Sequence, residues 1–181
     1  MSSRLTAVTP AELLKLPQPM NGRHYELSAG QLIVAGNAGA RHERVKQRIL
    51  TALILWAAQH QTGSVFAESQ FTLNEHTARI PDVAFVGPTK LALLPDADVP
   101  IPFSPDLAVE IISESESAAD AETKVQEYLV AGVAEVWQLY PREQRVRIRR
   151  SESIEDLASS QVLDTPILPG FRTPVRDLFS R

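Results

Sequence analysis

The sequence contains no cysteine, so the chain has no disulfide bond and no thiolate that could bind a metal or attack a substrate. It also lacks an apolar run long enough to span a bilayer, and its N-terminus lacks the apolar segment of a signal peptide. We therefore expect a cytoplasmic protein with no membrane partner, whose fold is stabilised by packing alone.

Aromatic residues make up only 6% of the chain, which gives little support to a paired-carboxylate hydrolase acting on sugars. The formal net charge of -4 argues against a protein that coats nucleic acid, because non-specific affinity comes from Lys and Arg. An enzyme that meets nucleic acid at one local patch is still compatible with this charge. The chain also lacks a Gly-rich phosphate loop, a Gly-x-Ser-x-Gly elbow and a His-Glu-x-x-His motif. Any hydrolysis would therefore depend on carboxylates or a metal ion.

The hydrophobic pattern predicts one α/β domain over residues 1–181, with residues 1–20 as a helical lead-in. The expected elements are, in order, a short helix from Pro10, a hairpin over 25–35, a helix over 41–61, strands over 65–67, 71–73, 80–86 and 107–112, a helix over 115–131, strands over 136–140 and 145–149, and a last strand edge with a short helix. The proline-rich stretch 95–105 is expected to form a mobile edge of the functional site.

Two acidic residues, Asp82 and Glu110, stand inside runs that otherwise have the composition of buried strands. A buried carboxylate is costly unless it is paired or coordinated. Because side chains alternate along a strand, Asp82 shares a face with Ala84 and Glu110 with Ala108, which leaves space beside each acid. If the two strands are neighbours, both carboxylates point into one cleft, and their repulsion raises one pKa unless a cation lies between them. Mg²⁺ fits such a site, since it takes one or two carboxylates plus water and phosphate oxygens.

Each acid also has a purely structural explanation. Asp82 follows a proline and can cap backbone groups, and Glu110 can pair with an arginine of the sheet. Taken singly, the structural and functional explanations carry about equal weight. The occurrence of both acids in apolar strands favours a shared site.

Three further residues are candidates with ordinary alternatives. Lys124 lies at the edge of the buried stripe of its helix and can reach a cleft at the sheet, although helix geometry by itself favours a solvated lysine paired with Asp120 or Glu127. His42 continues the inward face of the long helix, which is more typical of a hydrogen-bonded core histidine than of a ligand. The pattern around Glu26 is that of an exposed strand glutamate.

A set of short motifs runs in one order from about Tyr25 to the C-terminus. In sequence, the set is Tyr25-Glu26-Leu27, Gly30-Gln31-Leu32, His42, Pro81-Asp82-Val83, Pro105-Asp106-Leu107-Ala108-Val109-Glu110-Ile111-Ile112-Ser113, Lys124 with Tyr128 and Gly132-Val133, Glu135-Val136-Trp137, and Leu168-Pro169-Gly170. Each piece is short, and the ordered set is much more specific. It resembles the Uma-type putative restriction endonuclease family, which belongs to the PD-(D/E)xK nuclease superfamily.

The resemblance implies a restriction-endonuclease-like fold, with a central mixed β-sheet flanked by helices. It implies a Mg²⁺- or Mn²⁺-dependent endodeoxyribonuclease that hydrolyses DNA phosphodiester bonds, with Asp82 and Glu110 as metal-binding acids that Glu26 joins. Lys124 matches the position from which the family supplies its lysine, and His42 matches a further family position. In these roles Lys124 orients water or stabilises developing charge, and His42 contacts phosphate or assists proton transfer.

The chain departs from the wider superfamily around the second acidic strand. The usual lysine two residues after the second acid is replaced by Ile112, and Glu114 and Glu116 make the rim of the site more acidic. These departures keep a second hypothesis open, in which a catalytically weak or inactive nuclease fold serves as a nucleic-acid-binding or protein-interaction module.

DNA is the expected partner, and a homodimer would suit cleavage of both strands, although no motif requires one. The alternating residues Arg145, Arg147 and Arg149 can meet the DNA backbone. More often, such a stripe is a solvated strand face or a dimer contact.

Overall fold

The computed structural model describes residues 8–17, 19, 23–36, 39–97, 99–113 and 116–180. Its elements are α1 (Pro10–Leu13), β1 (Arg23–Ser28), β2 (Gln31–Gly36), α2 (Ala40–His60), β3 (Ser64–Ala67), β4 (Phe71–Asn74), β5 (Thr77–Arg79), β6 (Val83–Val86), α3 (Pro88–Leu91), β7 (Leu107–Ile111), α4 (Ala118–Val130), β8 (Glu135–Tyr140), β9 (Arg145–Arg149), β10 (Ile154–Leu157), β11 (Val162–Asp164), β12 (Arg172–Pro174) and α5 (Val175–Phe179). Part of the predicted lead-in (residues 1–7, 18 and 20) and Glu114 lie outside the described residues.

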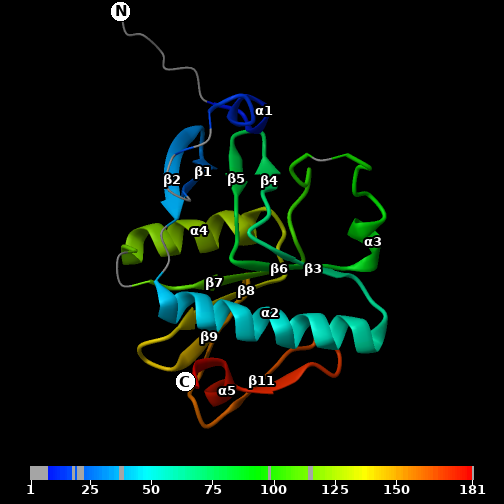
Figure 1. Ribbon diagram of the computed structural model, residues 1–181, viewed down its shortest axis with the longest axis vertical. Helices are drawn as coiled ribbons and strands as arrows, with labels where there is room; N and C mark the ends of the chain where they lie inside the picture. Colours follow the sequence, from blue (N-terminus) through cyan, green and yellow to red (C-terminus); the bar gives the residue numbers. More distant parts are fainter. Residues whose placement is uncertain are drawn as a thin grey trace, which may run out of the picture.

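A six-stranded mixed sheet, in the order β10-β9-β8-β7-β6-β3, forms the centre of the fold. Its β7–β8 pair is parallel and its other pairs are antiparallel. Helices α2 and α4 lie on opposite sides of β7 and β8, and the C-terminal β11 and α5 lie beyond α2 (Figure 1). The predicted central mixed sheet flanked by helices is confirmed.

The strands of this sheet alternate between two cores. Val109 and Ile111 join Ile49, Leu53 and their neighbours in the larger core beneath α2. Residues at the intervening positions, such as Ala108 and Val136, pack beneath α4 with Val125 and Tyr128. This period-two burial on both faces follows from strand geometry, and it holds the central strands rigid at the point where the acidic residues emerge.

A second sheet, in the order β2-β1-β5-β4, is antiparallel throughout and lies at the end of the molecule that α1 covers (Figure 1). Helix α1 begins as predicted: the Thr9 hydroxyl accepts a hydrogen bond from the Glu12 backbone, and the Glu12 carboxylate accepts one from Thr9 N–H. Leu13 of α1 then packs on Leu27 and Ala78, at the centre of this sheet.

The prediction of one strand over residues 80–86 was wrong. The chain forms β5 in the second sheet, leaves it at Ile80, and re-enters regular structure as β6 in the central sheet. Pro81 lies at the break, since proline has no N–H for a ladder hydrogen bond. Asp82 is therefore a bend residue just before β6 and does not lie inside a strand.

Among the described residues, no helix combines the length and apolar character that crossing a membrane requires.

Candidate functional site

A cleft of about 570 Å³ opens where the two sheets meet. Its walls come from the β1–β2 hairpin, the start of α2, the β5–β6 connection, the end of β7 and the start of α4. All five predicted site residues, Glu26, His42, Asp82, Glu110 and Lys124, line it. The geometry thus brings together residues that are spread over almost a hundred positions of the sequence.

Asp82, in the bend just before β6, lies opposite Glu110 of the neighbouring strand β7. Val83 pairs with Val109 in the antiparallel β6–β7 ladder, so the residue before Val83 and the residue after Val109 continue that register. The Asp82 Oδ2 atom accepts a hydrogen bond of 2.7 Å from Ile111 N–H, which holds the bend against the end of β7. The predicted backbone cap and the predicted shared cleft are both present, and the cap serves to position the acid.

Lys124 reaches the cleft from α4 and contacts two acids that come from different sheets. Its Nζ atom donates to Glu110 Oε2 at 3.1 Å and lies 3.4 Å from Glu26 Oε1. Burial opposes the charge on Lys124, but Glu110 and Glu26 outweigh it and raise the lysine pKa above its usual value. The alternative of a solvated lysine paired with Asp120 or Glu127 is not what the structure shows.

Glu26 is buried, which excludes the alternative of an exposed strand glutamate. Arg79 of β5 donates to Glu26 at 2.9 Å and to Glu127 of α4 at 2.6 Å, and Ile80 N–H donates to Glu26 at 3.0 Å. Burial opposes ionisation of Glu26, but Lys124 and Arg79 outweigh it and lower the Glu26 pKa. These contacts fasten the second sheet to α4 and fix Glu26 as a carboxylate.

Glu110 has the opposite balance. Burial raises its pKa to about 7, Lys124 counteracts the shift, and the negative charges of Asp82 and Glu26 add to it. The Tyr128 hydroxyl donates to Glu110 Oε1 at 2.8 Å and favours the ionised form. Glu110 is thus a carboxylate that one lysine and one hydroxyl do not fully compensate, and a further cation would lower its pKa.

His42 lies between two acids, one on each side of its ring. Its Nε2 atom is 3.3 Å from Asp82 Oδ1, and its Nδ1 atom is 3.5 Å from Glu43 Oε1. Burial lowers the His42 pKa, but the hydrogen bond and charge of Asp82 outweigh it, so the net shift is upward. Lys46 in turn holds Glu43 at 2.8 Å. His42 points inward as predicted, and it faces the cleft acids.

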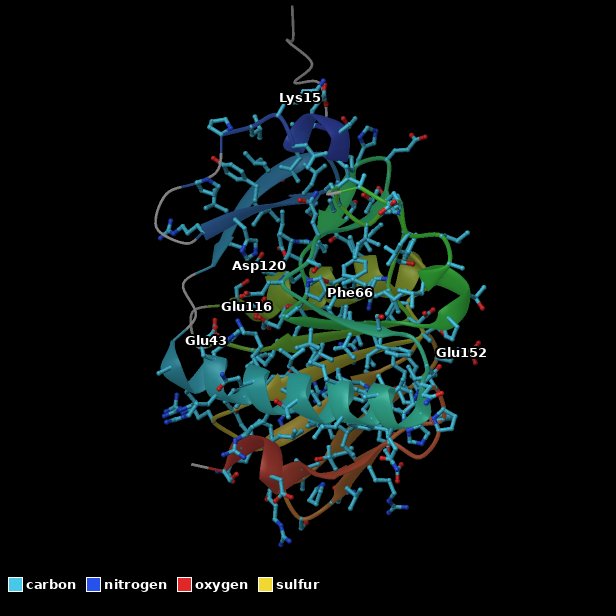
Figure 2. The ribbon with its side chains drawn as sticks, turned by 45° about the vertical axis from the view of Figure 1, so that its right-hand side comes forward. Lys15, Glu43, Phe66, Glu116, Asp120 and Glu152 are labelled. Atoms are coloured by element: carbon cyan, nitrogen blue, oxygen red, sulfur yellow. The ribbon has the colours of Figure 1, made fainter. Side chains whose placement is uncertain are left out.

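The cleft carries an excess of acid. Its described lining residues include five carboxylates, with Glu116 and Asp120 at the α4 end, and only two permanent cations, Arg79 and Lys124. In Figure 2, Glu116 and Asp120 lie on the same side of the molecule as Glu43, between the β1–β2 hairpin and α2. Burial, with the charges of Asp82 and Glu26, also raises the Glu116 pKa, although Lys124 opposes this. An acid excess in a confined cleft is complementary to a hard cation.

The acids are not arranged as a finished metal cage. Among the described residues, no three His, Asp or Glu side chains are grouped closely enough to hold a metal ion by themselves. A Mg²⁺ ion does not need three, since one or two carboxylates with water complete its shell. The pair Asp82 and Glu110 meets that requirement, whereas Glu26 is engaged by Arg79 and Lys124. The donor set therefore fits a hydrated divalent ion better than a caged one.

Two residues to which the sequence assigned no role prove central. Arg79 is buried between Glu26 and Glu127, and Tyr128 is buried against Glu110. A signal for Tyr128 existed, because it lies one helical turn after Lys124 and so shares its face. No local pattern pointed to Arg79, whose partners depend on pairing between distant segments.

The structure bears on two other expectations. None of the described residues lining the cleft comes from 87–106, so the proline-rich stretch does not border it. The arginine stripe is already paired: Arg145 and Arg147 contact Asp156, and Arg149 contacts Glu122. Arg145 and Arg147 lie on a partly solvated strand face, whereas Arg149 is buried, and all three charges have acidic partners within the chain.

A family model described as "Uma2: Putative restriction endonuclease" matches residues 10–176. The chain belongs to the Uma2 family. A crystal structure described as "a putative nuclease belonging to DUF820", from Anabaena variabilis ATCC 29413, superposes with a TM-score of 0.81 at 20% identity, covering 95% of this chain and 97% of that one. At this identity the superposition establishes the shared fold. No curated protein matches the sequence.

Proposed function

We propose that this Uma2 protein is a metal-dependent endonuclease that hydrolyses DNA phosphodiester bonds in the cleft between its two sheets. The observation that carries the proposal is the convergence of Asp82 and Glu110, at neighbouring strand ends, with Lys124 of α4, in a family whose description is "Putative restriction endonuclease". Two carboxylates beside a lysine are what a phosphodiester needs: cation ligands on one side and a positive hydrogen-bond donor on the other.

Asp82 and Glu110 would bind Mg²⁺ or Mn²⁺, and Glu26 would hold Lys124 in position by its ion pair. The bound ion would polarise the phosphate and lower the pKa of a coordinated water. Lys124, already charged and aimed at Glu110, is placed to donate to a phosphate oxygen as negative charge develops. His42, with its pKa raised beside Asp82, is placed to contact phosphate or to give a proton to the leaving oxygen.

Calorimetric titration of the full chain with Mn²⁺ tests the ligand assignment. Asp82→Asn keeps the side-chain shape and removes one ligand charge, so we expect Mn²⁺ binding to weaken by about tenfold or more. Asp156→Asn is the matched control, because Asp156 lies on β10 and pairs with Arg145 and Arg147 of β9, none of which lines the cleft. Equal binding by wild type and Asp82→Asn would contradict the assignment.

Cleavage assays on linear, branched and single-stranded DNA, with and without chelator, test the activity. We expect metal-dependent cleavage that Asp82→Asn abolishes. Lys124→Gln should keep Mn²⁺ binding, since the ammonium no longer competes for Glu110, and should slow cleavage by about a hundredfold or more. Cleavage that persists in chelator would contradict a metal-dependent nuclease.

A non-catalytic module is the second candidate, and the acid excess of the cleft favours it. Lys124 forms ion pairs with both Glu26 and Glu110, and such an arrangement can stabilise the fold without any role in catalysis. A Mn²⁺ isotherm that Asp82→Asn abolishes, together with no cleavage of any DNA form, would support this candidate over the endonuclease.

A further inference from the structure

Strand β2 forms one edge of the second sheet, at the outer left of the molecule in Figure 1. Its inner side pairs with β1, and among the described residues no strand pairs with its outer side. Its sequence, Gln-Leu-Ile-Val-Ala-Gly, contains neither a charge nor a proline. Leu32, Ile33 and Val34 are consecutive and exposed, at 41%, 36% and 50%.

Two other sheet edges in this protein are protected. The edge strand β10 carries Glu155 and Asp156, both exposed. The edge at β4 is covered by the segment around Ile101, which exchanges backbone hydrogen bonds with Gln70 and Thr72. Natural proteins protect edges in these ways because an open strand recruits another strand. Among the described residues the apolar β2 edge has neither protection, which points to a strand that covers it in the assembled protein.

We propose that β2 pairs with β2 of a second copy of this chain, in antiparallel register about Ile33, to form a two-fold dimer with a continuous sheet. Residues that face each other across such a pair share one face of the sheet, so one residue must face its own copy and the two-fold axis must pass midway between the two. This leaves a short set of registers to compare.

Centring on Ile33 places Leu32 against Val34 of the second copy and Ile33 against Ile33, so the three exposed apolar side chains meet one another, and Ala35 faces Gln31. Centring on Val34 places Leu32 against Gly36, and centring on Leu32 places Ile33 against Gln31. The neutral strand also brings no like charges together. A self-complementary apolar edge of this kind fits a second copy better than an unrelated strand, whose side chains would have to match by chance.

The dimer would also affect the cleft. Ile33, Val34 and Ala35 line it, so the second copy would lie beside its mouth. Both clefts would open on the same face of the joined sheet, since the axis is perpendicular to that sheet. The inference does not depend on the chemistry of the cleft and stands whether or not the cleft cuts DNA.

Light scattering coupled to size exclusion tests the assembly. We expect a dimer mass for the wild type and a monomer mass for Ile33→Lys and for Ile33→Glu, because like charges would face each other across the axis. Mixing the two variants should restore the dimer by opposite charge. Ile154→Lys, an exposed isoleucine on the β10 edge, is the matched control and should stay dimeric. A monomeric wild type, or a mixture that stays monomeric, would overturn the proposal.

The absence of native cysteine makes the register testable. Opposed Cα atoms in an antiparallel pair lie about 4.5 or 5.5 Å apart, within disulfide range. Ile33→Cys should therefore cross-link two chains rapidly under mild oxidation. Leu32→Cys, about 8 Å from its own copy in this register, should not. Equal cross-linking at both positions on a non-reducing gel would overturn the register.

Discussion

The protein contains two networks built from the same kinds of charged residue, and they differ in burial and balance. The cleft network joins Glu26, Arg79, Glu127, Lys124 and Glu110, and the side chains of Glu26 and Arg79 are only 1% and 3% exposed. The surface network joins Arg145 and Arg147 of β9 to Asp156 of β10, with side chains 30%, 31% and 48% exposed. Water shields the second network and is nearly excluded from the first.

The difference in burial determines how much each network contributes to stability and how far it shifts pKa values. Exposed pairs are worth about 0–1 kcal/mol and can be lost at little cost. Buried charges are costly to desolvate, so each member of the cleft network depends on its partners. Only the buried network leaves one member, Glu110, with a pKa raised to about 7. Confinement without full compensation makes the cleft complementary to a cation, and the surface network lacks this property.

Arg79→Met should produce the largest effect, because it removes one partner of a buried pair. Glu26 and Glu127 would lose the guanidinium that holds them at 2.9 and 2.6 Å. We expect the free energy of unfolding to fall by about 3–5 kcal/mol, measured by urea denaturation. A loss no greater than that of a surface arginine variant would show that the two networks are energetically alike.

Tyr128→Phe should have the next largest effect. The hydroxyl is fully buried and donates to Glu110 at 2.8 Å, so its removal leaves a buried carboxylate short of one donor. We expect a loss of about 1–3 kcal/mol in unfolding free energy and weaker Mn²⁺ binding in calorimetry. Tyr25→Phe, outside the cleft, is the control and should change neither. Unaltered stability in Tyr128→Phe would mean that Glu110 does not need this donor.

Local pattern was sufficient for much of the fold. Burial at every third or fourth residue located α2, because Val45, Ile49 and Leu53 carry the period of a helix. The apolar runs around Asp82 and Glu110 indicated a shared site on the condition that their strands are neighbours, and the β6–β7 pairing meets that condition. The same reasoning placed Asp82 inside a strand, since it gave the apolar run more weight than Pro81, whose missing N–H breaks the ladder.

Long-range pairing lay beyond local pattern. Glu26 is buried because β1 pairs with β5, about fifty residues away, through Leu27 and Ala78. No periodicity within either segment encodes that pairing, so Arg79 and Glu26 appeared unrelated. Short strands such as β5 and β11, three residues each, also carry too few positions for alternation to be visible.

Glu122→Gln probes a pair of intermediate exposure. Hydrogen bonds from Arg149 are the main cause that lowers the Glu122 pKa from 4.5 to about 2. A carboxylate with a lowered folded pKa contributes stability above its unfolded pKa and loses it as pH falls through the folded value. Between pH 4.5 and 2 we expect the free energy of unfolding to fall more in the wild type than in the variant. Since Glu122 is 49% exposed, this difference should be smaller than about 1 kcal/mol. Urea titrations across this range measure the difference, with exposed Glu152→Gln as control.

Arg147→Ala should have the smallest effect. Asp156 accepts two hydrogen bonds of 2.9 Å from this guanidinium, which is 31% exposed. We expect about 0–1 kcal/mol of lost stability in urea, shrinking further as salt screens the pair. The same variant tests the stripe as a DNA contact, because losing one phosphate contact would reduce the salt slope of binding by about one. Two nitrogen atoms of the Arg147 guanidinium already donate to Asp156, and few donors are left for a phosphate, so the salt slope should not change. A reduced salt slope would show that the surface network contacts DNA, which would leave catalysis as the role of the cleft.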